Sequence, residues 1–508
     1  MQPSLDALRS LVETDLVDEK INLYPIYKYA PADDITLTQA YLKLARLNSK
    51  NRTESFFFDS AVKGDSVDRY SFIGIRPKKV IRTGDNDSFL KEYRDVDPIS
   101  ILEEELDKYH QVQFPGLPNF KGGAVGYISY DCIKYFEPTT KVSLKDPLRL
   151  PEAVFMVCDI IVVFDSVYRR MQIIRNVELP KGKDVTPYYE SAVKEIEEIE
   201  QILSVTSDEL VDPYQPPIKE DQQFTSNLGQ AGYEKCVNTL KDHIVKGDII
   251  QAVPSQRVSR PTTLHPFNLY RHLRTVNPSP YLFYIDLLDF QIIGASPELL
   301  VKSDVNNKIV THPIAGTIKR GQNAEEEEHN AYALRNSLKD KAEHIMLVDL
   351  ARNDVNRICT PESNSVDRLL TIQRLSHVMH LVSEVSGTLR DGLSRYDAFR
   401  SIFPAGTVSG APKVKAMTLI SELEGEKRGV YAGAVGHWGY DGKSMDTCIA
   451  LRTMVFKEGT AYLQAGGGIV FDSDSYEEYL ETMNKMKANN NTIVEAEKIW
   501  LQRVGTEP

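Results

Sequence analysis

Short β-rich runs separated by turn-length links are the feature that most limits how this chain can fold. In the C-terminal half, YLFYID (281–286) and FQIIGA (290–295) follow one another with only three residues between them. Antiparallel neighbours need only a turn, whereas parallel neighbours need a crossover of a dozen or more residues. The pattern therefore predicts an antiparallel α+β fold rather than a parallel doubly wound sheet.

Apolar residues at helical spacing predict helices around these strands. The segment 187–204 is amphipathic, with its apolar face formed by Val193, Ile196, Ile199 and Leu203. Further helices are expected at 232–246, 325–356, 411–423 and 475–489.

A polar stretch at 205–227 contains three prolines and shows no periodicity, which is typical of a linker or surface loop. It separates an N-terminal region at 21–204 from a C-terminal region at 228–508. Residues 1–20 are expected to form an N-terminal arm, either loose or as a solvated helix.

Composition excludes several classes of protein. The net charge of −12 argues against a dedicated nucleic-acid binder, and it means that any site for an anion must be built locally. Five cysteines, none of them in a CxxC pair, indicate reduced thiols in a cytoplasmic protein. No signal peptide is visible, and the apolar runs are too short to span a bilayer, so no membrane contact is expected.

Two groups of acidic residues could hold a hard cation. Asp340 and Glu343 are three residues apart on an expected helix, and Glu478, Glu481 and Lys485 share a face of another. Mg²⁺ takes few carboxylates together with waters and substrate oxygens. The spacing is equally typical of a helix-capping box at Ser475-x-x-Glu478 and of a surface ion pair between Glu481 and Lys485.

Other segments could bind an anion or move a proton. Gly466, Gly467 and Gly468 could turn consecutive amides toward an anion, although a tight turn has the same pattern. Arg452 lies in an apolar strand, where a guanidinium needs a bound carboxylate or a structural ion pair. His380 is a candidate acid or base, and a hydrogen-bonded core histidine is the alternative.

Ten motifs follow one another in order along the C-terminal region. They are GDIIQAVPSQR (247–257), NPSPYLFY (277–284), GASPELL (294–300), PIAGT (313–317), AEHIMLVDLARND (342–354), FPAGTVSGAPK (403–413), GAVGHW (433–438), DTCIALRT (446–453), QAGGGIV (464–470) and EYLETMNK (478–485). Together with a looser match that includes GGAVGYISYD (122–131), they resemble the motifs of the chorismate-utilising enzymes. The resemblance implies two packed antiparallel β-sheets flanked by helices, with the active site between them.

The resemblance also assigns site residues. It implies that Glu343 and Glu481 bind Mg²⁺, with Asp340 and Glu478 at neighbouring positions around the metal-bound waters. In the mechanism that we expect, Glu298 is our candidate proton donor for the first half of the reaction, and His380 is our candidate for the second half. The positions that match the family's chorismate-binding residues are Gly316, Thr317, Tyr431, Arg452, Gly466, Gly467, Gly468 and Lys485.

Two positions indicate which chemistry is used. Relatives that attack the ring with a lysine amine carry that lysine at the position of Ala315, and relatives that activate water carry a lysine at the position of Gln251. Neither residue here can perform these steps, so ammonia is the expected nucleophile and anthranilate the expected product. An isochorismate- or salicylate-forming enzyme, or a non-catalytic regulatory subunit, are the alternatives.

Two partners follow from the same resemblance. The chain has no glutaminase motif of its own, so a glutamine amidotransferase subunit is expected to supply the ammonia. Family members bind tryptophan as a feedback inhibitor, and the matching positions here are Ser60, Pro280, Tyr281 and Leu282. Asp59 stands where many members have glutamate.

Overall fold

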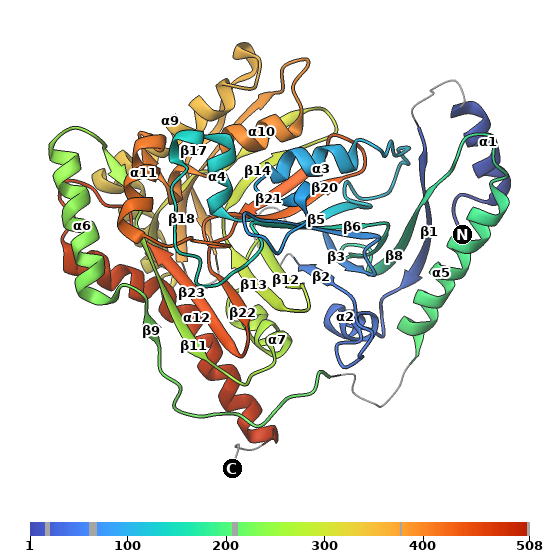
Figure 1. Ribbon diagram of the computed structural model, residues 1–508, viewed down its shortest axis with the longest axis horizontal. Helices are drawn as coiled ribbons and strands as arrows, with labels where there is room; N and C mark the ends of the chain where they lie inside the picture. The colour runs from blue at the N-terminus through green and yellow to red at the C-terminus, as the bar shows by residue number, and fades with distance from the viewer. Residues whose placement is uncertain (16–20, 60–68, 206–211, 376–377, 505–508) are drawn as a thin grey trace.

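The computed structural model describes residues 1–15, 21–59, 69–205, 212–375 and 378–504. Within these residues, two large antiparallel sheets pack face to face with helices around them (Figure 1). This architecture confirms the predicted α+β class.

The first sheet has eleven strands in the described part of the chain, all joined by antiparallel pairing. In spatial order they are β1 (Leu23–Pro31), β8 (Arg170–Glu178), β7 (Ile160–Asp165), β3 (Tyr70–Ile75), β2 (Ser55–Asp59), β12 (Tyr281–Asp286), β13 (Phe290–Ser296), β22 (Thr453–Lys457), β23 (Thr460–Gly466), β11 (Ser255–Pro261) and β9 (Thr225–Ser226).

The second sheet has ten strands over the same residues, with β17 (Ser365–Arg374) pairing β18 outside the main path. The path runs β16 (Ile314–Lys319), β18 (Val378–Thr388), β15 (Lys308–Thr311), β14 (Leu299–Ser303), β21 (Met445–Ile449), β20 (Ala434–Gly439), β5 (Gly123–Ile128), β6 (Ala153–Cys158) and β4 (Lys79–Thr83). A separate two-stranded ladder joins β10 (Gln251–Ala252) to β19 (Gly410–Ala411).

The helices surround the two sheets. In Figure 1, α1 and α5 lie beside β1 and β8 at one end of the molecule, while α6 and α11 lie at the opposite end. The bounds are α1 (Leu5–Asp15), α2 (Leu37–Ala45), α3 (Pro98–Leu106), α4 (Ile133–Phe136), α5 (Thr186–Ser204), α6 (Gly229–Val245), α7 (Pro266–Val276), α8 (Ala324–Asn336), α9 (Leu338–Asn356), α10 (Arg395–Ile402), α11 (Lys413–Glu424) and α12 (Ser475–Val504), with short 3₁₀ turns η1 (Lys91–Tyr93), η2 (Tyr130–Cys132), η3 (Pro138–Thr140), η4 (Pro361–Ser363) and η5 (Gly406–Val408).

Both sheets mix strands from the regions before and after 205–227. β12 pairs β2 in the first sheet, and β20 pairs β5 in the second. The apolar layer between the sheets likewise draws on both regions, with Phe56, Tyr127, Phe283 and Cys448 all fully or almost fully buried in one cluster. Of the segment itself, the described part begins beside α7, where the buried Gln215 side chain accepts from the His265 amide at 2.8 Å, and it reaches the first sheet as β9, which pairs with β11.

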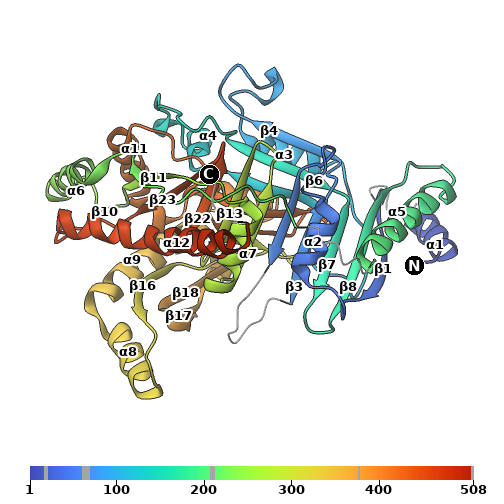
Figure 2. The same cartoon turned by 90° about the horizontal axis from the view of Figure 1, so that it is seen from below.

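Two expected helices differ from those found. The helix expected at 325–356 is two helices, because Ser337 is extended (φ −60°, ψ 118°) and its side chain caps α9 by accepting from the Asp340 amide. The helix expected at 475–489 continues to Val504 as α12. Figure 2 shows α8 extending to one side of the body beside β16, β17 and β18. No helix among the described residues has the length and apolar character needed to cross a bilayer.

Candidate active site

The glycine segment 466–468 lies between the two acidic helices. On the α9 side, the Gln251 side-chain amide donates to Glu343 Oε1 at 2.8 Å. A Cβ atom on Gly468 would lie 2.5 Å from Gln251 Nε2 and 3.2 Å from Glu343 Oε1. The missing side chain at Gly468 therefore lets this amide–carboxylate pair rest directly on the backbone.

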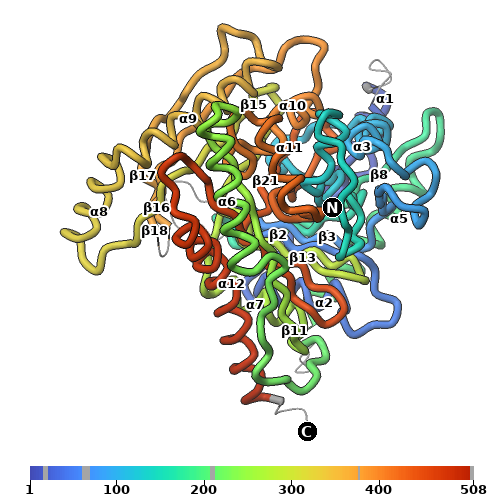
Figure 3. The backbone as a smooth tube through the Cα atoms, turned by 60° about the vertical axis from the view of Figure 1, so that its left-hand side comes forward, coloured from blue at the N-terminus to red at the C-terminus, as the bar shows by residue number. Residues whose placement is uncertain are grey.

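The α12 side supplies the second acidic group. A Cβ atom on Gly467 would lie 2.9 Å from Glu478 Oε2, and Lys485 Nζ donates to the Gly466 carbonyl at 2.9 Å. Lys485 also pairs with Glu481 at 2.7 Å. Carboxylates from α9 and α12 thus flank one glycine segment, while α6 packs alongside α12 (Figure 3).

The capping-box alternative for Glu478 is wrong. The amides of Tyr476 and Glu477 donate to Asp474 Oδ1, so Asp474 caps α12. Glu478 Oε1 instead accepts from the Ser473 hydroxyl at 2.6 Å, and burial together with the nearby Glu481 charge raises the pKa of Glu478.

Two buried acceptor atoms without a hydrogen-bond partner indicate that a cation would fit beside the glycine segment. Gln251 Oε1 and Glu478 Oε2 are both buried without a hydrogen-bond partner, and each belongs to a side chain against the glycine segment. Atoms that can only accept are satisfied by a cation or by its bound waters. Across the described residues, no three His, Cys, Asp or Glu side chains gather as a protein-only metal cage. The donor set therefore fits a cation that keeps waters and substrate oxygens, as Mg²⁺ does.

The PIAGT motif forms the edge of the site on β16. Gly316 has a left-handed φ of +79°, and a Cβ there would lie 3.2 Å from Asp340 Oδ1. This bulge brings Thr317 Oγ1 to 2.9 Å from His380 Nδ1 on β18. The buried His344 ring, next to Glu343, reaches the Ala315 carbonyl at 3.4 Å and so ties α9 to the same turn.

His380 and Arg452 line a cavity of about 320 Å³. Burial and the nearby Arg452 charge lower the pKa of His380 to about 4, so its ring is neutral at physiological pH. Burial also lowers the pKa of Arg452, and no ion pair to Arg452 forms within the described ranges. The structural-ion-pair alternative for Arg452 is therefore not observed. Ala488, Asn491 and Thr492 of α12 form the facing wall.

Glu298 lies at the start of β14 in a small cavity of about 20 Å³. Burial raises the pKa of its carboxyl group to about 8, against the opposing effects of the Thr407 hydroxyl and the Ile314 amide. The neighbouring Pro297 lines the same cavity as His380 and Arg452. Glu298 therefore holds its proton at neutral pH, close to the larger cavity.

Tyr431 is the remaining predicted substrate residue, and it lies beneath the glycine segment. A Cβ on Gly466 would be 3.1 Å from its hydroxyl, and burial raises the pKa of Tyr431 to about 12. Three contacts were not predicted from the sequence: the Gln251–Glu343 hydrogen bond, the Tyr233 hydroxyl that accepts from the Gly467 amide at 3.2 Å, and Thr407 beside Glu298. The GDIIQAV and FPAGT motifs marked two of these segments, but not their contacts.

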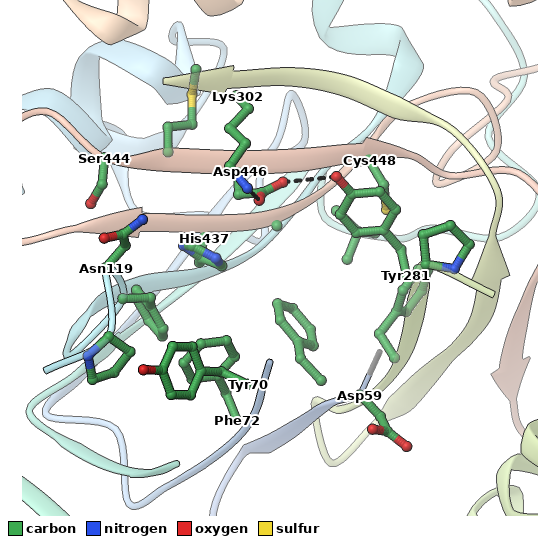
Figure 4. Close-up of a pocket in the computed structure, with 18 of the residues that line it drawn as sticks. Asp59, Tyr70, Phe72, Asn119, Tyr281, Lys302, His437, Ser444, Asp446 and Cys448 are labelled. Atoms are coloured by element: carbon green, nitrogen blue, oxygen red, sulfur yellow. Dashed lines mark hydrogen bonds and ion pairs between the residues drawn. The ribbon is translucent and has the colours of Figure 1, made fainter. Parts of the chain in front are cut away.

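A second cavity of about 310 Å³ contains the residues predicted to bind tryptophan (Figure 4). Pro280, Tyr281 and Leu282 line it together with Asp59, whereas Ser60 lies outside the described residues. Tyr281 donates to Asp446 Oδ1 at 3.0 Å, as the dashed line in Figure 4 marks.

The walls of this second cavity combine aromatic rings with charges. The His437 ring stacks on Phe120 with centroids 4.2 Å apart, and burial lowers the pKa of His437 to about 4. Lys302 pairs with Asp446 at 2.9 Å. Flat apolar walls with charged groups at the edge suit an aromatic amino acid.

Comparison with known proteins identifies the protein class that has this sheet order, glycine segment and pair of acidic helices. The chain belongs to the chorismate binding enzyme family, whose model matches residues 53–491, and it is an enzyme of that family. It is 61% identical over 507 residues to anthranilate synthase component 1 of Saccharomyces cerevisiae, covering 100% of this chain and 99% of that protein.

Solved structures of similar proteins have the same fold. Anthranilate synthase component I from Streptococcus pneumoniae TIGR4 is 35% identical, with a TM-score of 0.73 and coverage of 91% of this chain and 99% of that one. The menaquinone-specific isochorismate synthase of Escherichia coli has a TM-score of 0.69 over 96% of this chain and 99% of its own, but at 15% identity it shows the fold alone.

Proposed function

We propose that this chain converts chorismate and ammonia to anthranilate, pyruvate and water, as component 1 of an anthranilate synthase at the first committed step of tryptophan biosynthesis. One observation carries the proposal: carboxylates of α9 and α12 meet at a bare glycine segment beside Lys485 and Tyr431. Chorismate is a dianion, and an acidic protein needs such local positive charge to bind it.

Gln251 and Ala315 favour this product over isochorismate or salicylate. Neither side chain is a base or an amine, so neither activates water nor attacks the ring. The Gln251 amide instead donates to Glu343. Ammonia arrives with a lone pair and needs no such base, which leaves amination as the chemistry that this site supports.

Magnesium is the cofactor in this proposal. Glu343 and Glu481 would hold it, and Glu478 and Asp340 would contact its bound waters. When bound, it supplies positive charge for the ring carboxylate of chorismate. Lys485 and Arg452 add the remaining positive charge. Within the glycine segment Gly466, Gly467 and Gly468, the Gly467 amide donates to the Tyr233 hydroxyl, so the Gly468 amide is the donor left for the substrate.

Two buried groups are suited to move the protons. Ammonia adds at ring carbon 2 while the hydroxyl leaves from carbon 4, and Glu298 gives that hydroxyl its proton. Loss of the carbon 2 proton then expels pyruvate and makes the ring aromatic. His380 assists this second half: Nδ1 lies 3.4 Å from the Gly316 carbonyl, which can only accept, and this contact favours a lone pair on Nε2.

A glutamine amidotransferase subunit supplies the ammonia in this proposal, and tryptophan inhibits by binding the second cavity, with Pro280, Tyr281 and Leu282 in its wall. Similarity to component 1 relatives supports the amidotransferase, and the aromatic walls beside Asp446 support the inhibitor. We place the enzyme in the cytoplasm, where its free cysteines would stay reduced.

An assay without any partner tests the function directly. The purified chain, with ammonium salt, chorismate and Mg²⁺, should form fluorescent anthranilate, and chelation should abolish it. Glu343→Gln should lower kcat/KM about 10²-fold or more and should also weaken Mg²⁺-dependent chorismate binding in calorimetry. Isochorismate as the product would support the rival enzyme, and no turnover with intact ligand binding would indicate a regulatory subunit.

A further inference from the structure

A buried ion pair, Arg428 with Glu424, lies beneath the candidate active site and takes no part in the proposed chemistry. Arg428 is 3% exposed and Glu424 is 8% exposed. Arg428 Nε donates to Glu424 Oε2 at 2.9 Å, and Nη2 donates to Oε1 at 2.7 Å. The pair is thus a two-pronged arrangement that only a guanidinium can make.

The rest of the guanidinium holds two other segments. Nη2 donates to the Val253 carbonyl at 2.7 Å, two residues after Gln251. Nη1 donates to the Val408 carbonyl at 2.9 Å, and Val408 follows Thr407, which lies beside Glu298. One side chain therefore fixes the strand that carries Gln251 and the turn that contacts Glu298.

Glu424 extends the same connection to the glycine segment. Its Oε1 accepts from the Ser255 amide at 2.7 Å and from the Ser255 hydroxyl at 3.0 Å. That hydroxyl also accepts from Gln464 Nε2 at 2.8 Å, two residues before Gly466 on β23. The orientation of the glycine segment thus depends on the carboxylate of Glu424.

Tyr431 is the fourth part of the site that lies next to this ion pair. The Arg428 guanidinium lies 5.6 Å from the Tyr431 ring centroid, and Asp131 accepts from the amides of Arg428 and Gly429, which holds the chain leading to Tyr431. A buried ion pair seldom adds stability compared with apolar residues of the same volume. Within the described residues, the other hydrogen bonds of the two side chains go to Val253, Val408 and Ser255, each in a segment that carries or supports a site residue.

We propose that Arg428 and Glu424 are positioning residues that hold the Gln251 strand, the Thr407 turn, Tyr431 and the glycine segment in one register for catalysis. The pair touches none of the reacting atoms. The inference rests on the proposed location of the chorismate site, because the four segments matter to catalysis only if the substrate binds there.

Arg428→Lys tests the proposal, because it keeps the charge and removes the fork. One ammonium cannot satisfy Glu424, Val253 and Val408 from a single point, so the segments should shift by fractions of an ångström. We expect kcat/KM for chorismate to fall about 10²-fold, with a higher KM as well as a lower kcat, because small misplacements carry that cost. Near-UV circular dichroism and the thermal midpoint report whether the fold is kept.

Arg395→Lys is the matched control. Arg395 is 2% exposed, donates to the Gly439 and Ser444 carbonyls at 2.7 and 2.6 Å, and lies over the Tyr396 ring. It should lose comparable thermal stability while kcat/KM stays within about threefold of the parent. Equal kinetic losses in both variants, in proportion to their thermal midpoints, would show that the pair is merely structural.

Two further variants keep the test decisive. If Arg428→Lys does not fold, Glu424→Gln keeps the shape and removes the charge, and it should lower kcat/KM about tenfold. Parent-like kinetics for Glu424→Gln would overturn the proposal. Glu343→Gln and Tyr431→Phe test the site itself: if both stay fully active, the site is misplaced, whereas if both lose activity and Arg428→Lys does not, only the positioning role is wrong.

Discussion

At the scale of single residues, burial moves the pKa values of Glu298 and His380 in opposite directions. It raises that of Glu298 to about 8 and lowers that of His380 to about 4. Burial disfavours the charged form of each, so both side chains are neutral near pH 7. The Glu298 carboxyl group can therefore donate a proton, and the His380 ring can accept one. The proposed acid and base steps require these two roles.

The pKa of Glu298 predicts an alkaline limit to activity. The acid works only while protonated, so kcat/KM should be constant below about pH 7 and fall about tenfold per pH unit above about pH 8. Total ammonium must be adjusted at each pH to keep neutral ammonia constant. Glu298→Gln should be about 10²-fold or more slower and should lack this limit. An unchanged alkaline limb in that variant would contradict the assignment.

The raised pKa of Glu298 also predicts that the free energy of unfolding depends on pH. Its folded-state pKa of about 8 lies above the ordinary 4.5, so the folded protein binds this proton more tightly than the unfolded chain does. The contribution is fully present below about pH 4.5 and is lost as the pH rises toward about 8. Denaturant unfolding across this window should show the slope, and Glu298→Gln should flatten it. Equal slopes in both proteins would mean that Glu298 is ionised when folded.

His380 should separate the two halves of the reaction. His380→Phe removes the lone pair but fills the same place, so chorismate should still be consumed while anthranilate forms about 10²-fold more slowly. Chromatography of quenched reactions should show the aminated intermediate. If both steps slowed equally in His380→Phe, the role in pyruvate release would be wrong.

At the scale of elements, local patterns foretold the strands well and the helix ends less well. YLFYID and FQIIGA became β12 and β13 with a hairpin between them, because alternating packing and a short link determine that pairing. The break at Ser337 was missed because helical spacing continues across it, although a serine three residues before Asp340 is a capping signal. The end of α12 was missed because the polar run NNNT (489–492) interrupts the apolar spacing, which resumes at Ile493 and Ala496. In this last part of the helix, Arg260 pairs bidentately with Glu497.

The sequence likewise predicted some residues of the candidate site and missed others. The motifs named Glu343, Glu478 and the glycines, because each lies in a run that stands out along the chain. The Arg428–Glu424 pair went unnoticed, because both residues lie just beyond the helix expected at 411–423 and no local pattern shows that they meet. In the structure α11 ends at Glu424 and Gly425 is left-handed (φ 65°), so the chain turns back and brings Arg428 to Glu424.

The glycine segment yields a prediction at this scale. Gly468→Ala places a Cβ 2.5 Å from Gln251 Nε2, so the amide must move and its hydrogen bond to Glu343 is lost. We expect kcat/KM to fall about 10²-fold with unchanged far-UV circular dichroism. Gly232→Ala in α6 is the control, where the nearest atom is the flexible Leu228 side chain at 3.2 Å, and it should stay within about twofold. Full activity in Gly468→Ala would separate this segment from the site.

At the scale of the whole molecule, one loop connects the cavity that contains His380 with the cavity that contains Asp446. Residues 276–279 line the cavity that contains His380, and residues 280–283 line the cavity that contains Asp446. Inside the loop, the buried Ser279 hydroxyl donates to the Ser296 carbonyl at the end of β13. The Ser296 hydroxyl in turn accepts from the Glu298 amide at 3.3 Å. A ligand that moves Tyr281 therefore acts on the backbone that carries the proposed acid.

This arrangement predicts how tryptophan and chorismate should affect each other. Coupling between two sites is reciprocal, so tryptophan should weaken chorismate binding by the same factor, about 5- to 150-fold, as chorismate weakens tryptophan binding. Without ammonia there is no turnover, and calorimetry can measure both affinities.

Ser279→Ala removes the hydroxyl that joins the loop to β13, so each ligand alone should bind within about threefold of the parent while the coupling factor falls toward one. Ser401→Ala loses the same kind of hydrogen bond, to the Asp354 carbonyl at 2.8 Å, lines neither cavity, and should keep the full coupling. Parent-like coupling in Ser279→Ala would mean that the two cavities communicate by another route, and no effect of tryptophan on the parent would remove the inhibitor from the second cavity altogether.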